Sequence, residues 1–225
     1  MYIFLKKIKF TLKTERVKVL FDRISSLVLF KIGLRCSETL FFYYDLLAEY
    51  NCFNDLGYLL LKDINFMVIP DLKMLLNFKT IPERMDFVPI QQWFDRGAMC
   101  LAIVLNNRVI AYTWVHRETY DNLGPAGVLS LRDDEVFIGP FYTDPEFRKM
   151  GLFQRLMYDS LVWLKDNDVN LVYGSCSISN IATIKVLVNS GFSALGIVNV
   201  TRNKFEVLNF RHSLLLNSKI MKGSL

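Results

Sequence analysis

A short basic loop between a predicted strand and a long predicted helix is the part of this sequence best suited to chemistry. Residues 136–143 are predicted to form a strand that ends at Asp144-Pro145, and residues 151–167 a strongly periodic helix. The loop between them carries Arg148 and Lys149. The first N–H groups of a helix have no intrahelical partner and carry partial positive charge, so such a loop can hold a pyrophosphate. Taken alone, the pattern is more often an ordinary connection with exposed charges.

Two side chains near this loop could exchange protons with a substrate. Glu135 begins the predicted strand and shares a face with Phe137 and Gly139, because side chains alternate along a strand. His116 lies on a predicted hairpin strand, and imidazole titrates near neutral pH. Each also has a plain structural interpretation, Glu135 as a solvated charge at a strand end and His116 as an edge residue. Both are therefore candidates for a general base.

The elements that would position these residues form a mixed α/β pattern. A β-hairpin is predicted over residues 100–105 and 109–117 around Asn106-Asn107, and a long loop over 118–133 follows it. The order of elements suits a mixed sheet covered by helices on both faces. The other predicted elements are a strand at 58–64, a helix at 65–78 interrupted at Pro70, a helix at 87–96 stopped by Gly97, a strand at 170–175, a helix at 180–190 closed by Gly191, and strands at 194–200 and 205–214.

Residues 1–57 are predicted to form a helical extension of a domain that spans residues 58–225. Residues 17–34 have the pattern of an amphipathic helix, and a second short helix is predicted to start near Thr39. The extension is interpreted either as a cap over apolar surface of the domain or as a helix on a membrane surface next to a basic cluster. That cluster comprises Lys6, Lys7, Lys9, Lys13 and Arg16.

Composition narrows the kinds of partner and environment. The net charge of +5 fits an anionic membrane surface or a phosphorylated small ligand, and the lack of interleaved aromatic and basic residues argues against nucleic acid. The 4 cysteines lie far apart without CxxC spacing and only 2 histidines are present, so we expect reduced thiols and no metal centre. Without a signal-peptide pattern or an apolar run of about 18 residues, we expect a cytoplasmic protein with at most peripheral membrane contact.

Two segments resemble motifs of the GNAT superfamily of N-acetyltransferases. Residues 145–157 are similar to its acyl-CoA-binding motif, in which Arg148 and Gly151 match and Phe153 stands where Gly or Ala is common. Residues 180–192 are similar to a second motif, an Asn-led helix that ends in Gly-Phe, with Thr183 in the small-residue place. The two segments occur in order and in register with the predicted elements. The resemblance covers about residues 58–205.

The resemblance implies the fold and the donor site. It implies an α/β fold with a central, mixed, mostly antiparallel sheet flanked by helices, and two strands, 136–143 and 170–175, that separate to admit pantetheine. The implied co-substrate is acetyl-CoA or another short acyl-CoA, without a metal. Backbone groups of Phe141, Tyr142 and Thr143 would hold pantetheine and polarise the thioester. The implied pyrophosphate site comprises Arg148, Lys149, Met150, Gly151, Leu152 and Phe153, and Asn180 would lie near the pantetheine.

The resemblance implies a general base and a general acid, but this sequence lacks the usual acid. Members of the superfamily use a Glu near the separated strands as a base and a Tyr in the last helix to protonate the leaving thiolate. Leu187 occupies the place of that Tyr, so Tyr142 or Tyr173 could replace it, or the thiolate leaves without help. The catalytic candidates are therefore Glu135, His116, Tyr142 and Asn180.

The acceptor amine is inferred from a finer resemblance. The sequence of residues 138–148 resembles that of GNAT members in bacterial surface-polysaccharide and lipopolysaccharide biosynthesis, and so do the extension and the long loop. Those transfer a short acyl group to an amine on a nucleotide-linked deoxysugar. The alternatives are another small amine, a peptide or lipid-linked substrate, and a non-catalytic acyl-CoA-binding module. A monomer and a homodimer are both compatible with the sequence. Four aromatic residues could stack on a base or sugar, namely Trp93, Tyr112, Trp114 and Tyr120, although Trp93 and Trp114 are more often core residues.

Overall fold

A mixed β-sheet forms the centre of the molecule. The computed structural model describes residues 37–48, 63–87, 89–120, 128–200, 205–208 and 220–221. Among the described strand pairs of this sheet, β7 (Glu135–Ile138) and β9 (Leu171–Ser177) run parallel, and the other pairs are antiparallel. The strand order is β11 (Phe205–Leu208), β10 (Ser193–Val200), β1 (Ser37–Asp45), β9 (Leu171–Ser177), β7 (Glu135–Ile138), β4 (Arg108–His116), β3 (Met99–Leu105) and β2 (Asn65–Ile69), with β8 (Tyr142–Thr143) paired to β4.

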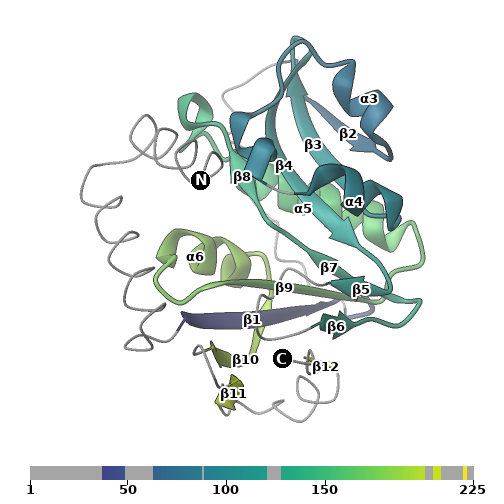
Figure 1. Ribbon diagram of the computed structural model, residues 1–225. Coiled ribbons are helices and arrows are strands. Elements are labelled where there is room, and N and C mark those ends of the chain that lie inside the picture. The colour runs from purple at the N-terminus through teal and green to yellow at the C-terminus, as the bar shows by residue number, and fades with distance from the viewer. Residues whose placement is uncertain are drawn as a thin grey trace, which may run out of the picture.

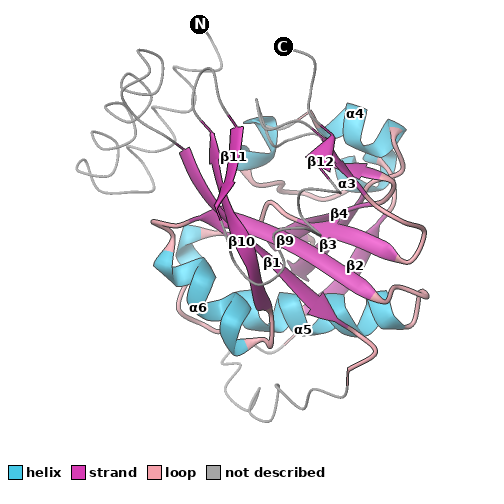
Figure 2. Cartoon of the chain, turned by 90° about the horizontal axis from the view of Figure 1, so that it is seen from below, coloured by secondary structure: helices cyan, strands magenta, loops and turns pink. Residues whose placement is uncertain are grey.

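Helices cover the sheet on two faces. Helices α5 (Leu152–Lys165) and α6 (Ile181–Asn189) lie on one face, and α3 (Leu72–Leu76) and α4 (Ile90–Asp95) lie on the other (Figure 2). A short 3-10 helix, η1 (Glu83–Phe87), precedes α4. The residues of α5 that face the sheet are buried and recur at helical spacing, as expected for an amphipathic helix. Those residues are Leu152, Leu156, Met157, Ser160, Leu161 and Leu164.

A second, three-stranded sheet covers the half of the main sheet that α3 and α4 leave open. It consists of β5 (Thr119–Tyr120), β6 (Val128–Ser130) and β12 (Ile220–Met221). Its side chains Tyr120 and Leu129 pack with Phe137 of β7 in an apolar cluster. The rings of Tyr120 and Phe137 are stacked, with their centroids 3.7 Å apart. The loop predicted over 118–133 is thus partly strand.

Several predicted elements are confirmed. The hairpin of β3 and β4 turns at Asn106 and Asn107, which have φ angles of 49° and 61°. Left-handed conformations at both positions are those of the two-residue turn that suits a twisted hairpin, and asparagine tolerates them. Helices α4, α5 and α6 form where the periodicity predicts them, β9 forms at its predicted place, and β10 pairs with β11 as expected. Residues 209–214 of the last predicted strand lie outside the described residues. No helix in the described residues is long and apolar enough to cross a membrane.

Two predictions in the first part of the chain are wrong. The short helix expected near Thr39 is the strand β1, which lies between β9 and β10 (Figure 1). Phe41 and Phe42 are both buried, in clusters on opposite faces of the sheet, so the apolar run lacks the alternation that marks a half-exposed strand. The helix expected from Asn65 is the strand β2 followed by the short α3, because residues 65–69 pair with β3.

The remaining predictions for this part of the chain are not tested. The helix at 17–34 and most of the strand at 58–64 lie outside the described residues. The domain boundary at residue 57 stays a prediction as well. Since β1 belongs to the main sheet, residues 37–45 nonetheless form part of the central fold.

Candidate active site

The centre of the candidate site is the point where β7 and β9 separate. Their parallel register runs from Glu135 opposite Leu171 to Ile138 opposite Gly174 and ends there. Beyond it the chain crosses to β8, which pairs only with β4 among the described strands. Strand β9 continues to Ser177 and pairs with β1. The predicted strand over 136–143 is therefore two short strands, and β8 and β9 diverge as Figure 1 shows.

A corner at Gly139-Pro140 directs the chain away from β9. The peptide bond between the two residues is cis, and Gly139 has a φ of 138° that other residues rarely adopt. The N–H of Gly139 donates to the carbonyl of Trp114 at 2.9 Å. Nε2 of His116 donates to the carbonyl of Gly139 at 3.2 Å. Strand β4 thus holds the corner at which the separation begins.

His116 is buried beside this corner. Its side chain is among aromatic rings, with the centroids of Trp93 and Tyr120 at 4.9 and 4.8 Å. A carbonyl oxygen only accepts hydrogen bonds, so Nε2 carries the proton in the bond to Gly139. A base function, which stays a prediction, would therefore fall to Nδ1. The interpretation of His116 as an edge residue is wrong, because β4 lies inside the sheet.

The basic loop joins β8 to α5. Asp144 begins a 3-10 helix, Pro145–Phe147, and its Oδ1 accepts from the N–H of Glu146 at 3.1 Å. Lys149 and Gly151 follow with φ angles of 66° and 76°. Gly151 is the N-cap of α5 and supplies no side chain to the helix terminus.

The N–H groups at this terminus are open. No hydrogen bond within the described part of the chain uses the N–H groups of residues 149–154, whereas Arg155 donates to the carbonyl of Gly151 at 3.0 Å. Arg148 and Lys149 are exposed on the same loop, and Nε of Arg148 donates to the carbonyl of Thr143 at 3.2 Å. Six successive N–H groups without a partner in the described residues, together with two cations, form a positive site suited to an anion.

Apolar side chains at the start of α5 pack against the protein interior and hold the loop in place. Leu152 is buried, and Phe153 packs against Phe141 with ring centroids 4.9 Å apart. Met150 is half-buried. Phe153, at a position where the family motif usually has a small residue, therefore contacts the chain between β7 and β8.

Asn180 follows the end of β9, the strand from which β8 has separated, and precedes α6. Its side chain caps α6 by accepting from the N–H of Thr183 at 3.3 Å. Its own N–H donates to the carbonyl of Ser177 at 2.9 Å, and the side chain is exposed. Leu187, on the same helix, is fully buried.

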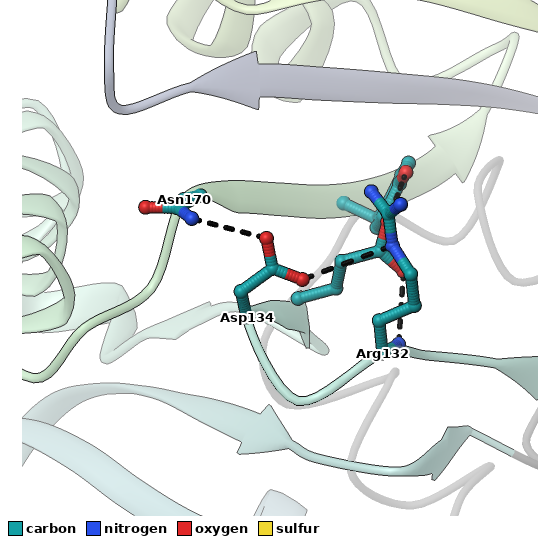
Figure 3. A network of polar contacts seen from close by, with 5 residues as sticks. Arg132, Asp134 and Asn170 are labelled. Carbon is teal, nitrogen blue, oxygen red and sulfur yellow. Dashed lines mark hydrogen bonds and ion pairs between the residues drawn. The ribbon is translucent and has the colours of Figure 1, made fainter.

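Glu135 lies at the other end of β7, where its buried carboxylate joins a polar network with the exposed Arg132. Figure 3 shows Arg132, Asp134 and Asn170 of this network. Its carboxylate accepts from Nε of Arg132 at 3.1 Å, from the Arg132 N–H at 3.0 Å and from the Tyr173 hydroxyl at 3.2 Å. Asp134 joins the network to β9 by accepting from Nδ2 of Asn170 at 3.0 Å. The interpretation of Glu135 as a solvated charge is wrong, since its side chain is 0% exposed. Four residues at about 3.3 Å each put it about 13 Å along the strand from Gly139.

Two tyrosines of the candidate site, Tyr142 and Tyr173, have raised pKa values. Burial, together with the nearby Glu135 carboxylate, raises the pKa of Tyr173. Burial raises the pKa of Tyr142 to about 12, and the Asp144 carboxylate adds to the effect. Both phenols are therefore neutral at physiological pH and release their protons less readily than a free tyrosine does. The Tyr142 ring stacks on Tyr112 at 5.3 Å.

The four aromatic residues considered for stacking on a substrate do not present their rings. They are at most 6% exposed, and Trp93 packs edge-on against Trp114 at 5.1 Å. The core interpretation of Trp93 and Trp114 is confirmed and the stacking interpretation is wrong, because the four rings fill the clusters beneath α4 and the second sheet. Sequence reasoning also missed Arg108 and Arg132, whose carboxylate partners include the distant Asp144 and the neighbouring Glu135, respectively.

Solved structures with a similar chain path include several acetyltransferases. A putative GNAT-family acetyltransferase from Novosphingobium aromaticivorans is 16% identical with a TM-score of 0.47, and the match covers 75% of this chain and 64% of that one. A GNAT-family acetyltransferase from Colwellia psychrerythraea is 13% identical with a TM-score of 0.49, covering 76% and 56%. An aminoglycoside antibiotic 6'-N-acetyltransferase from Acinetobacter baumannii is 16% identical with a TM-score of 0.40, covering 66% and 97%. The chain thus spans less than two thirds of the first two proteins.

A match between this sequence and a family model identifies the family. No curated protein matches the chain. Residues 69–192, more than half of the 225, match the sequence model of the acetyltransferase (GNAT) family. The match contains β7, the corner, the basic loop and α5. The protein therefore belongs to the GNAT acetyltransferase family.

Proposed function

We propose that this protein transfers a short acyl group from acyl-CoA to a primary amine. The observation that carries the proposal is the separation of β8 from β9 next to six open N–H groups on a basic loop. A long, narrow donor with a pyrophosphate at one end fits both features. The separated strands would take its extended arm, and the loop would take its charge.

The loop residues bind the donor in this proposal. The N–H groups of residues 149–154 donate to the pyrophosphate, and Arg148 and Lys149 add charge attraction. The backbone at Phe141, Tyr142 and Thr143 lines the other wall and orients the thioester carbonyl. Fixed N–H donors there stabilise the oxyanion that develops when the amine attacks.

Proton transfer requires a base and an acid. The acceptor ammonium must lose a proton before its nitrogen can attack, and Glu135 and His116 are the proposed bases. Glu135, about 13 Å along the strand from Gly139, would act through a chain of water molecules. Tyr142, on the short strand beside the separation, is the proposed acid, and its raised pKa makes it a weaker acid than a free tyrosine. It would give its proton to the departing CoA thiolate. Asn180, after the end of β9, is proposed to orient the arm of the donor.

The acceptor we propose is an amine on a nucleotide-linked deoxysugar. Support comes from the resemblance of residues 138–148 to the surface-polysaccharide branch and from the net charge of +5, which suits a diphosphate. The buried positions of Trp93, Tyr112, Trp114 and Tyr120 remove aromatic stacking from this support. Recognition of the nucleotide would then rest on other contacts.

Ligand-induced stabilisation followed by turnover tests the proposal. A ligand that binds only the folded state raises the thermal midpoint. We expect CoA and acetyl-CoA to raise it, and acetyl-CoA with an acceptor to release free thiol. Nucleotide diphosphates and a panel of nucleotide-linked amino sugars, polyamines, peptides and aminoglycosides identify the acceptor. No response to CoA would contradict the donor assignment, and thiol release with only non-sugar amines would contradict the acceptor assignment.

A further inference from the structure

Arg108, at the start of β4, contacts three residues of the segment that leads into the basic loop. One guanidinium nitrogen lies 2.7 Å from Oδ2 of Asp144 and 3.0 Å from Oε2 of Glu146. The centre of the guanidinium lies 5.3 Å from the centroid of the Phe147 ring. These three residues belong to or cap the 3-10 helix that directly precedes Arg148. One side chain on a central strand thus holds both carboxylates and the ring of this helix.

The backbone adds to the attachment. The N–H of Asp144 donates to the carbonyl of Ile110 on β4 at 2.8 Å, and Oδ1 of Asp144 caps the 3-10 helix while Oδ2 pairs with Arg108. Asp144 is therefore fixed at three atoms. The side chain of Asp144 is 13% exposed and that of Arg108 33%, so the pair is shielded from water in part. Such a charge-assisted pair is geometrically specific in a way that an exposed pair is not.

The charge balance of the segment also depends on Arg108. Asp144 and Glu146 put two negative charges within a few residues of a loop that would bind a pyrophosphate. Like charges at such range repel the ligand, and the repulsion grows where water is displaced. Arg108 lies between the two carboxylates and offsets them, which leaves the field of Arg148 and Lys149 to the donor.

We propose that Arg108 is a positioning residue for the donor: it holds residues 144–147 so that the N–H groups of 149–154 face the pyrophosphate, and it offsets the two carboxylates beside them. The inference rests on the proposed function, since it concerns the same donor site. Arg108 is not proposed to touch the reacting atoms. Its removal should therefore change donor affinity and leave the chemical step intact.

Donors with and without the pyrophosphate separate this function from a general structural one. We expect Arg108→Met to raise the Kd for CoA and the KM for acetyl-CoA about tenfold, with kcat unchanged. Acetyl-pantetheine, which lacks the nucleotide and the pyrophosphate, should react equally well with both proteins. Arg108→Lys keeps the charge but loses the planar guanidinium that contacts both carboxylates and the Phe147 ring, so it should recover only part of the CoA affinity.

A second arginine supplies the matched control. Arg155 pairs with Asp159 on α5 at 2.6 Å with side-chain exposures of 39% and 11%, close to those of the Arg108 pair. Arg155→Met should leave the Kd for CoA unchanged. Equal losses with acetyl-CoA and acetyl-pantetheine, or unchanged CoA affinity in Arg108→Met, would overturn the inference about Arg108. If the unaltered protein fails to bind CoA, the proposed function fails instead, so the two failures are distinguishable.

Discussion

Two glycines share one backbone conformation but differ in their surroundings. Gly97 and Gly151 have φ angles of 75° and 76°, and a Cβ added to either would meet no atom within 4 Å. Gly151 begins α5 at the basic loop, whereas Gly97 follows α4. A methyl group at either position therefore meets no steric obstacle and imposes the same left-handed strain, about 1–2 kcal/mol.

This pair gives a direct test of the donor loop. Gly151→Ala and Gly97→Ala should lower the free energy of unfolding by similar amounts, because the strain is the same. Only Gly151→Ala should weaken CoA binding, since relief of the strain turns the N–H groups of residues 149–154. Calorimetric titration with CoA checks this. Equal CoA affinities in the two variants would contradict the placement of the pyrophosphate.

Tyr142 predicts how stability changes at alkaline pH. Its pKa is raised by burial to about 12, above the value of about 10 for an unfolded chain, so the folded protein holds this proton more tightly. The resulting stabilisation is fully present below about pH 10 and is lost as the pH rises to about 12. In Tyr142→Phe the fall of the thermal midpoint over this interval should be shallower. Parallel curves for the two proteins would show that Tyr142 titrates normally.

At the scale of elements, the start of α6 combines a structural and a proposed binding function in Asn180. The side chain caps the helix through the N–H of Thr183, and Ser is an equally good cap, whereas Ala is not. Asn180→Ala should cost about 1 kcal/mol of stability. Asn180→Ser should keep the stability and still lower kcat/KM with acetyl-CoA, because it lacks the amide group.

Urea unfolding and steady-state kinetics measure the two effects separately. If Asn180→Ser retains full kcat/KM with acetyl-CoA, Asn180 serves only as a helix cap. If Asn180→Ala leaves stability unchanged, the cap itself contributes nothing measurable.

Elements with local signals could be predicted from the sequence, and elements defined by distant pairing could not. Asp144-Pro145, Gly151 and Gly191 mark the ends of β8, α5 and α6, so the loop and its helix were predictable. The apolar runs of β1 and β2 carry no clear period, and their identity depends on the strands beside them.

The same distinction holds for the candidate site. The basic loop lies within one stretch of sequence, so its residues could be named. The pairs of Arg108 with Asp144 and of Glu135 with Tyr173 join residues that are distant in sequence, and no local pattern links them. Burial of the aromatic residues also depends on the packing of α4 and the second sheet, which the sequence does not reveal.

For the whole molecule, the position of β1 predicts one cooperative unit. Phe42, on β1, is 0% exposed and belongs to the cluster beneath α5, whereas Leu47, just after β1, is 72% exposed. Phe42→Ala should lower the free energy of unfolding by about 3–5 kcal/mol, and Leu47→Ala by less than about 0.5 kcal/mol. Urea unfolding followed by fluorescence should show one transition in both variants. A separate early transition in Phe42→Ala would indicate that β1 unfolds independently.

The central position of β1 also determines when the sheet can be completed during synthesis. Tyr43 pairs with Tyr173 on one side and with Ser193 on the other, so both neighbours of β1 emerge from the ribosome long after β1 itself. Contacts so distant in sequence form slowly, because a long loop must close first. Until then an apolar strand with two unpaired edges is exposed to other chains. The nascent protein therefore carries this apolar strand without its partners through most of its own translation.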